Sequence, residues 1–143
     1  MPSSVHGATL VEVALTLVLL GVLTAISIPR AVSVVDRFSV RSASQDVVLA
    51  LAAARSAAAR RGDYVSFVAD PHTGRVRVVR AGETLFERDL GARRGVRLTA
   101  SRESVTFAPT GMGWGAANTT IVVSRGARAD TITTSRLGRV RRN

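Results

Sequence analysis

Apolar residues fill almost every position from residue 8 to residue 28, and the only charge in this run is Glu12. At about 1.5 Å per helical residue the run reaches roughly 30 Å, which is the thickness of the hydrocarbon core of a bilayer. The pattern therefore predicts a transmembrane helix over residues 8–28. Pro29 follows where the chain leaves the bilayer, and we expect it to kink the helix without ending it.

Beyond Pro29 the helical period continues to residue 61. Apolar residues recur at steps of seven, four, three and four, which places them on one stripe of a helix. The stripe consists of Val40, Val47, Leu51, Ala54 and Ala58. Arg60 and Arg61 ahead of Gly62 are typical of a last helical turn and its cap. We expect an amphipathic core helix without chemistry of its own.

From residue 63 onward the period of the pattern changes to two. Seven segments alternate apolar and polar residues and are predicted to be short strands. They are residues 64–69, 75–79, 84–89, 96–100, 104–108, 119–124 and 130–134. Turn residues separate them, most clearly in DPHTG at residues 70–74, and more weakly at residues 81–83, 91–95 and 126–129. The pattern predicts an α+β fold in which an antiparallel sheet packs on the long helix.

Composition narrows the picture further. The chain has 143 residues, no Cys and a formal net charge of +10, and all twenty of its basic residues are Arg. The part beyond the apolar run is large enough for one small domain and too small for two. Without Cys there is no disulfide, thiol nucleophile or soft metal ligand. The positive charge favours polyanionic partners such as nucleic acid, anionic lipid or surface polysaccharide.

Glu12 needs an explanation, because an unpaired carboxylate near the end of a spanning helix costs about 1–3 kcal/mol. A secretory signal peptide fits poorly, since residues 1–6 carry no Lys or Arg and the small residues Gly7 and Ala8 come before the apolar run. A plain membrane anchor that carries a β domain and enters no filament is a further alternative, and it gives Glu12 no role.

The segment GATLVE at residues 7–12, with the apolar helix after it, resembles the type III signal of type IV pilins and type II secretion pseudopilins. The resemblance implies that residues 1–7 are a leader, that a prepilin peptidase cuts between Gly7 and Ala8, and that Ala8 is N-methylated. Inside a filament core, the ammonium of Ala8 on one subunit can then neutralise Glu12 of its neighbour. The chain departs from the family at Ala8, where Phe is usual, and in a leader without basic residues.

The later segments resemble the GspH/FimT family of minor pseudopilins. They are ARSAAARRG at residues 54–62, VTFAPTGMGWGAANTTIVVS at 105–124 and ITTSRLGRVRR at 132–142. The resemblance implies a type IV pilin-like fold, with a long helix over residues 8–61 packed against a β-rich domain over residues 62–143. It also implies a single-pass protein of the bacterial inner membrane, with the β domain in the periplasm or on an extracellular filament. The implied partners are other pilins or pseudopilins, the prepilin peptidase and the membrane.

Two functions are open within this family: a structural subunit of a type II secretion pseudopilus or type IV pilus, and a minor pilin that binds double-stranded DNA in natural transformation. For DNA binding the resemblance points to a Gly-Arg-x-Arg motif, here Gly138, Arg139, Val140 and Arg141. Arg136, Arg142, Arg125 and Arg128 extend this basic region. If the tail is extended, Arg139 and Arg141 share one side, and Gly138 lets the backbone approach a phosphate. A solvated basic terminus is the simplest alternative.

Residues for enzymatic catalysis are missing from the sequence. His6 belongs to the leader, and His72 stands alone in a predicted turn. No His or acidic cluster has metal-ligand spacing, and no Ser lies in a nucleophile elbow. The GMGWG loop at residues 111–115 lacks the Lys and the following helix of a phosphate loop, so Trp114 is expected to be a packing or interface anchor. We expect no cofactor, no metal and no small-molecule substrate.

Overall fold

The computed structural model describes residues 9–142, and one helix occupies more than the first third of this range. This helix, α1 (Leu10–Arg61), continues through Pro29 as expected. The kink expected at Pro29 stays a prediction. The chain divides into two compact units between Val34 and Val35, and each is described in its own terms below. The predicted leader and the bond between Gly7 and Ala8 lie outside the described residues.

The first turn of α1 is closed by a side-chain cap. The hydroxyl oxygen of Thr9 accepts a hydrogen bond from the backbone N–H of Glu12 at 3.2 Å. A Thr three residues ahead of a Glu is the sequence pattern of a capping box, which satisfies one of the free N–H groups at a helix start. The large apolar side chains of residues 10–28 are all exposed.

The hydroxyl groups within this apolar segment are satisfied by the helix itself. Thr16, Thr24 and Ser27 donate to backbone carbonyls three or four residues earlier, at 2.7–2.8 Å. Such bonds replace water, so these residues are compatible with an apolar environment on every side of the helix.

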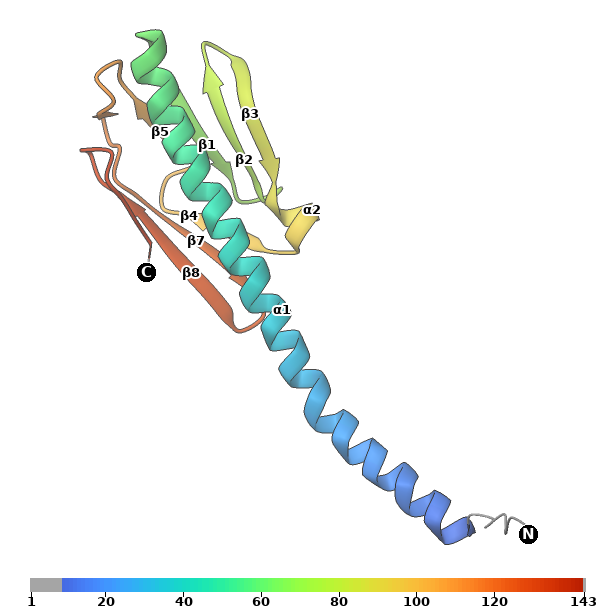
Figure 1. Cartoon of the computed structure of the whole chain (residues 1–143). Helices are drawn as coiled ribbons and strands as arrows, with labels where there is room; N and C mark the ends of the chain where they lie inside the picture. The colour runs from blue at the N-terminus through green and yellow to red at the C-terminus, as the bar shows by residue number, and fades with distance from the viewer. Residues whose placement is uncertain (1–8, 143) are drawn as a thin grey trace, which may run out of the picture. The chain divides into compact units, whose positions relative to one another are not determined.

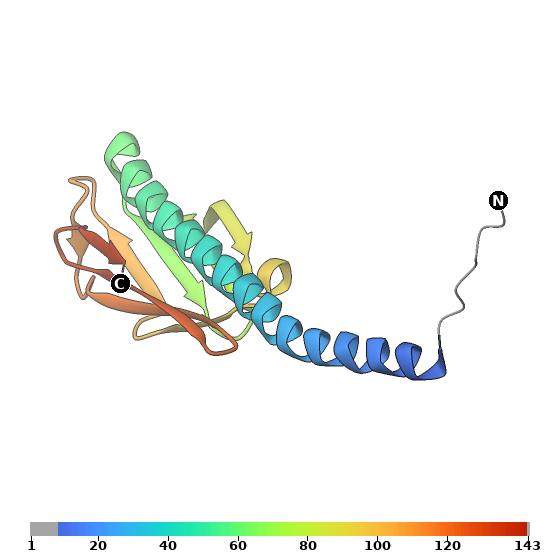
Figure 2. The same ribbon diagram turned by 60° about the horizontal axis from the view of Figure 1, so that its bottom comes forward.

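The part of α1 that begins at Val35 supplies the helical layer of the folded domain. All five residues of the predicted stripe are buried, which confirms that prediction. Ala43, Ala50 and Ala57 are buried beside them. Figures 1 and 2 both show this part of α1 lying along the strands. The small alanine side chains let helix and sheets approach closely at native packing density.

The first of two antiparallel sheets has the strand order β3-β2-β1-β5-β6. Its strands are β1 (Val65–Asp70), β2 (Arg75–Arg80), β3 (Glu83–Asp89), β5 (Ser104–Phe107) and β6 (Gly113–Trp114). Phe67 on the central strand β1 lies opposite Val78 and Val105. All three side chains are buried, because every second residue of a strand faces the same side of the sheet, which here is the core.

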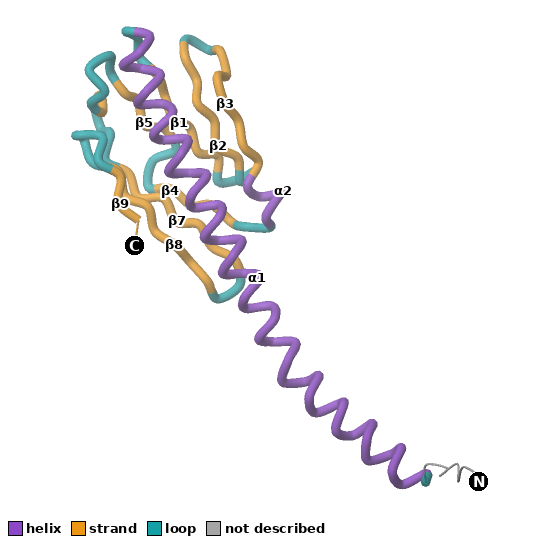
Figure 3. Tube along the Cα trace, in the orientation of Figure 1, coloured by secondary structure: helices purple, strands orange, loops and turns teal. Residues whose placement is uncertain are grey.

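The second antiparallel sheet has the strand order β4-β7-β8-β9. Its strands are β4 (Arg97–Ala100), β7 (Thr119–Arg125), β8 (Arg128–Thr134) and β9 (Val140–Arg142). Ile121 pairs with Ile132 in the register of β7 and β8, and both are buried. Figure 3 shows β8 and β9 on one flank of α1 and β2 and β3 on the other. The two sheets and α1 share one hydrophobic core.

The seven predicted strands are all present, with ends within two residues of the prediction. The expectation of one sheet is corrected to two, since the chain changes sheets between β3 and β4, between β4 and β5, and between β6 and β7. Strands β6 and β9 were not predicted, because two and three residues are too few to show an alternation.

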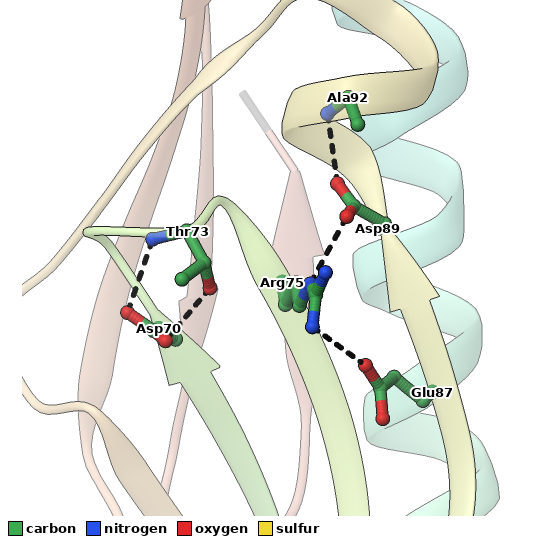
Figure 4. A network of polar contacts seen from close by, with 6 residues as sticks. All are labelled: Asp70, Thr73, Arg75, Glu87, Asp89 and Ala92. Atoms are coloured by element: carbon green, nitrogen blue, oxygen red, sulfur yellow. Dashed lines mark hydrogen bonds and ion pairs between the residues drawn. The ribbon is translucent and has the colours of Figure 1, made fainter.

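The segment predicted as a turn at residues 91–95 is instead a short helix, α2 (Leu90–Arg94). Asp89 caps it by accepting from the backbone N–H of Ala92 at 2.8 Å (Figure 4). Gly95 ends it with a φ of 61°. Its start is packed against the β1–β2 turn, where a Cβ on Gly74 would lie 2.9 Å from the Cα of Gly91. One helical turn is too short to reveal its period in a sequence.

Candidate functional site: an apolar helix and two arginine hollows

Glu12 is the one charged residue of the described apolar segment, residues 9–28. Within residues 9–28, each Ser or Thr hydroxyl takes part in a hydrogen bond to the backbone, whereas the carboxylate of Glu12 has no partner in the described part of the chain. Its side chain is exposed in the first turn of α1. No described residue of this chain therefore competes for the carboxylate.

The same helix is the candidate membrane segment. Among residues 9–142, α1 is the one helix long and apolar enough to cross a membrane. An exposed helix with satisfied hydroxyls and one free carboxylate is compatible with lipid only if that carboxylate is near the membrane surface or is paired.

The predicted Gly-Arg-x-Arg motif begins in a tight turn. Gly138 donates its N–H to the carbonyl of Ser135 at 2.8 Å, and its own carbonyl accepts from Nη1 of Arg55 at 3.3 Å. Gly138 is buried with a φ of 70°, and a Cβ there would lie 3.1 Å from the carbonyl oxygen of Gly111 and 3.2 Å from Nε of Arg55. The structure thus gives Gly138 a packing role against α1, and its expected approach to a phosphate stays a prediction.

The two central arginines of the motif lie just before and within β9. Arg139 and Arg141 line the same hollow, of about 450 Å³, which we call the outer hollow. Its other lining residues are Asn118, Thr133, Thr134, Ser135 and Leu137. Val140, between the two arginines, lines a different groove next to α1, which Arg139 also borders. This is the alternation expected for an extended tail, and it combines two cations with hydroxyl and amide groups.

Four other arginines surround a second hollow on the helix side of β9. It has a volume of about 220 Å³, and we call it the inner hollow. Its lining residues are Arg37, Val40, Arg41, Arg128, Ala129, Asp130 and Arg142. Nε of Arg142 lies 3.1 Å from Oδ2 of Asp130. Arg128 and Arg142 belong to the predicted basic region, whereas Arg37 and Arg41, about 90 positions earlier in the chain, were not predicted to join it.

The remaining two arginines of the predicted DNA-binding region lie elsewhere. Arg125 is bonded within the domain, because Nε lies 2.8 Å from Oδ1 of Asp36 and Nη1 donates to Ser39 and to the carbonyl of Arg94. Arg136 is exposed, and its carbonyl accepts from the N–H of Gly113 at 2.9 Å. The residues of the predicted basic region are therefore divided among two hollows, an internal ion pair and, for Arg136, an exposed turn.

Trp114 lies on β6 and is 61% exposed. Its ring packs edge-on against Tyr64, with centroids 5.1 Å apart. His72 is exposed in the β1–β2 turn, and no cluster of three or more metal-ligating side chains occurs among residues 9–142.

Three aspartates outside the two hollows have pKa values below the ordinary value. The hydroxyl and N–H of Thr73 lower the pKa of Asp70, and the N–H of Ala92 followed by Arg75 lowers the pKa of Asp89 (Figure 4). Arg80 lowers the pKa of Asp63. These carboxylates stabilise turns and a helix start, so their shifts have a structural cause.

A helix with an exposed apolar first part, and a second part packed on antiparallel sheets, is the architecture of type IV pilin-like proteins. The family model for the Type II transport protein GspH matches residues 43–138, which is more than half of the chain. The chain belongs to the GspH family. No curated protein sequence matches it.

Solved structures share this fold at low sequence identity. The type IV minor pilin FimU from Pseudomonas aeruginosa PAO1 is 19% identical with a TM-score of 0.62, over 73% of this chain and 88% of that one. The minor pseudopilin EpsH from the Type 2 Secretion System of Vibrio cholerae is 14% identical with a TM-score of 0.60, over 73% of this chain and 96% of that one. At these identities the likeness establishes the fold.

Proposed function

We propose that this chain is a minor structural subunit of a type IV pilus or type II secretion pseudopilus. The observation that carries the proposal is Glu12, the one unpartnered polar side chain in the described apolar segment of α1. In the membrane this carboxylate is a liability. In a filament core, where the helices of several subunits meet, a cation from a neighbouring subunit offsets its cost.

The proposed cation is the amino terminus of a neighbouring subunit. Cleavage between Gly7 and Ala8 creates an ammonium on Ala8, and methylation leaves its charge in place. An ammonium near Glu12 of the next subunit is strongly attracted, because the core of a helical filament has a low dielectric constant. The inner-membrane location before assembly and the action of the prepilin peptidase are parts of the same proposal.

The experiment replaces Glu12→Ala in the full chain and follows two fractions in the native host. We expect the variant to stay in the membrane at the normal level, while its amount in sheared filaments falls at least about tenfold, as the loss of one partly buried ion pair implies. Thr16→Ala is the control, since Thr16 bonds only to its own helix. Normal incorporation of the Glu12 variant would refute the pairing.

Cleavage is tested separately by mass spectrometry of the membrane-extracted protein. The proposal requires a mature chain that begins with N-methylated Ala8. An uncut chain in a host with an active prepilin peptidase would instead support a plain membrane-anchored β domain.

A second candidate function, DNA binding by a minor pilin, is favoured by the outer hollow. Arg139 and Arg141 line it together with Thr133, Ser135 and Asn118, so guanidinium, hydroxyl and amide groups are available to one phosphate. Aromatic stacking partners are scarce, so the expected ligand is duplex DNA bound through its backbone.

The test measures binding of the detergent-solubilised full chain to a duplex of random sequence at several salt concentrations. Arg139→Gln with Arg141→Gln should weaken binding and reduce the salt slope by about two. Arg97→Gln with Arg102→Gln is the charge-matched control, since both residues are exposed on other segments. Absence of binding at low ionic strength would eliminate this function.

A further inference from the structure

The inner hollow concentrates positive charge that the fold itself does not use. Four guanidinium groups and one carboxylate line about 220 Å³, which gives a formal charge of +3. Arg142 is paired with Asp130. The side chains of Arg37, Arg41 and Arg128 make no ion pair and no hydrogen bond with any described residue. Like charges around a small hollow repel, so this arrangement favours a bound anion.

Three separate elements build this hollow, so its four exposed arginines come from distant parts of the chain and not from one helix face. Arg37 and Arg41 are one helical turn apart on α1, Arg128 begins β8, and Arg142 ends β9. Guanidinium groups that converge from several directions suit the tetrahedral oxygens of a phosphate, which accept paired N–H donors.

Along the chain, the first arginine of the hollow is close to the candidate membrane segment. Arg37 comes nine positions after the end of the apolar run at residue 28, and a helix rises about 1.5 Å per residue, so the chain keeps Arg37 within about 14 Å of that end. Arginine side chains lengthen this reach. Their apolar stems can extend further while the charged group stays in the polar layer.

Exposed apolar residues surround these arginines on α1. Phe38, between Arg37 and Arg41 in sequence, is 72% exposed, and Val35 is 53% exposed. An aromatic side chain among arginines is typical of a segment at a membrane surface. Contacts to the backbone of duplex DNA would leave these apolar side chains in water, whereas a lipid surface covers them.

We infer that the inner hollow binds the phosphate group of an anionic phospholipid, such as phosphatidylglycerol, at the surface of the membrane that holds α1. This inference rests on the membrane anchoring proposed above. It assigns to Arg37, Arg41 and Arg128 a role in orienting the β domain on the membrane before assembly. The bound phosphate offsets the repulsion among the four guanidinium groups.

The test titrates the full chain in a zwitterionic detergent with phosphatidylglycerol or phosphatidylcholine, and counts the bound lipid by native mass spectrometry. The test variant combines Arg37→Gln with Arg128→Gln, and neither residue has an intramolecular partner in the described chain. Its control is Arg97→Gln with Arg102→Gln, which changes the net charge equally. Thermal unfolding checks that both variants are folded.

We expect the Arg37 and Arg128 variant to bind phosphatidylglycerol at least about tenfold more weakly, since two charge-assisted contacts are lost. The control and the binding of phosphatidylcholine should change by less than about twofold. Equal weakening in both variants would show a general charge effect and overturn the inference. Displacement of the lipid by millimolar inorganic phosphate, or by a short DNA duplex, would overturn it in favour of a free anion or nucleic acid.

Failure of the inferred lipid site can be distinguished from failure of the proposed function. The titration is done in detergent and reports on the hollow whether or not the chain enters a filament. Failure of the full chain to fractionate with membranes would contradict the anchoring itself. Unchanged lipid binding by the Arg37 and Arg128 variant, in a chain that does fractionate with membranes, would refute only the inferred phosphate site.

Discussion

Arg125 provides a sharp test of how the domain is held together. Its Nε lies 2.8 Å from Oδ1 of Asp36, and its Nη1 lies 3.2 Å from the hydroxyl of Ser39 and also donates to the carbonyl of Arg94. One guanidinium group thereby joins the end of β7 to α1 and to the end of α2. We predict that Arg125→Gln destabilises the domain.

The magnitude follows from burial and bonding. Hydrogen bonds to charged groups contribute about 1.5–3 kcal/mol, and removing one partner of a fully buried ion pair costs about 3–5 kcal/mol. The side chain of Arg125 is 33% exposed and that of Asp36 is 14% exposed, so solvent reduces the upper figure. We expect a loss of about 2–3 kcal/mol in the free energy of unfolding, which lowers Tm by roughly 10 °C for a domain of this size.

The assay is thermal unfolding of the full chain in detergent, followed by circular dichroism. Arg75→Gln is the matched control, because Arg75 makes more exposed ion pairs with Glu87 and Asp89 and should cost less than about 1 kcal/mol. Asp36→Asn closes a double-mutant cycle with Arg125→Gln, and their coupling should exceed about 1 kcal/mol. A Tm within 2 °C of the parent protein's for Arg125→Gln would refute this reasoning.

Three further predictions concern the core, a turn and acid stability. Phe67→Ala should cost about 3–5 kcal/mol in denaturant unfolding, because Phe67 is 0% exposed on the central strand, and a loss under 1 kcal/mol would contradict its place in the core. Gly74→Ala should lower the free energy of unfolding by at least about 2 kcal/mol more than Gly82→Ala does. Both residues have a positive φ, but only a Cβ on Gly74 would meet backbone atoms. Equal losses in the two variants would show that the positive φ alone sets the cost. Asp70 and Asp89 have lowered pKa values in the folded state, so their stabilisation is present above the unfolded pKa of about 3.9 and is lost as pH falls through the folded pKa. Below about pH 5, Tm should therefore fall less in Asp89→Asn than in the parent protein, and parallel profiles would contradict the assignment.

The sequence alone predicted the features that depend on local pattern. The apolar run, the stripe from Val40 to Ala58 and the seven main strands each repeat a period over enough residues to be recognised. The DPHTG turn was predicted because Asp and Gly have specific turn conformations. Glu12 stood out because one charge in a long apolar run is a local anomaly.

The tertiary structure decided which distant residues meet. It divided the strands between two sheets, paired Arg125 with Asp36, and packed Gly138 against Arg55. It also separated the arginines of the tail into two hollows and brought Arg37 and Arg41 to one of them.

These outcomes share a physical reason. The side chain of an arginine is compatible with solvent, an ion pair or a ligand site, so its residue type and local pattern do not select among these. The choice among them depends on the order of the strands in the two sheets and on the register of α1 against the strands. Hydrophobic burial along the whole chain sets that register, and the polar groups then take the neighbours that the packing brings to them.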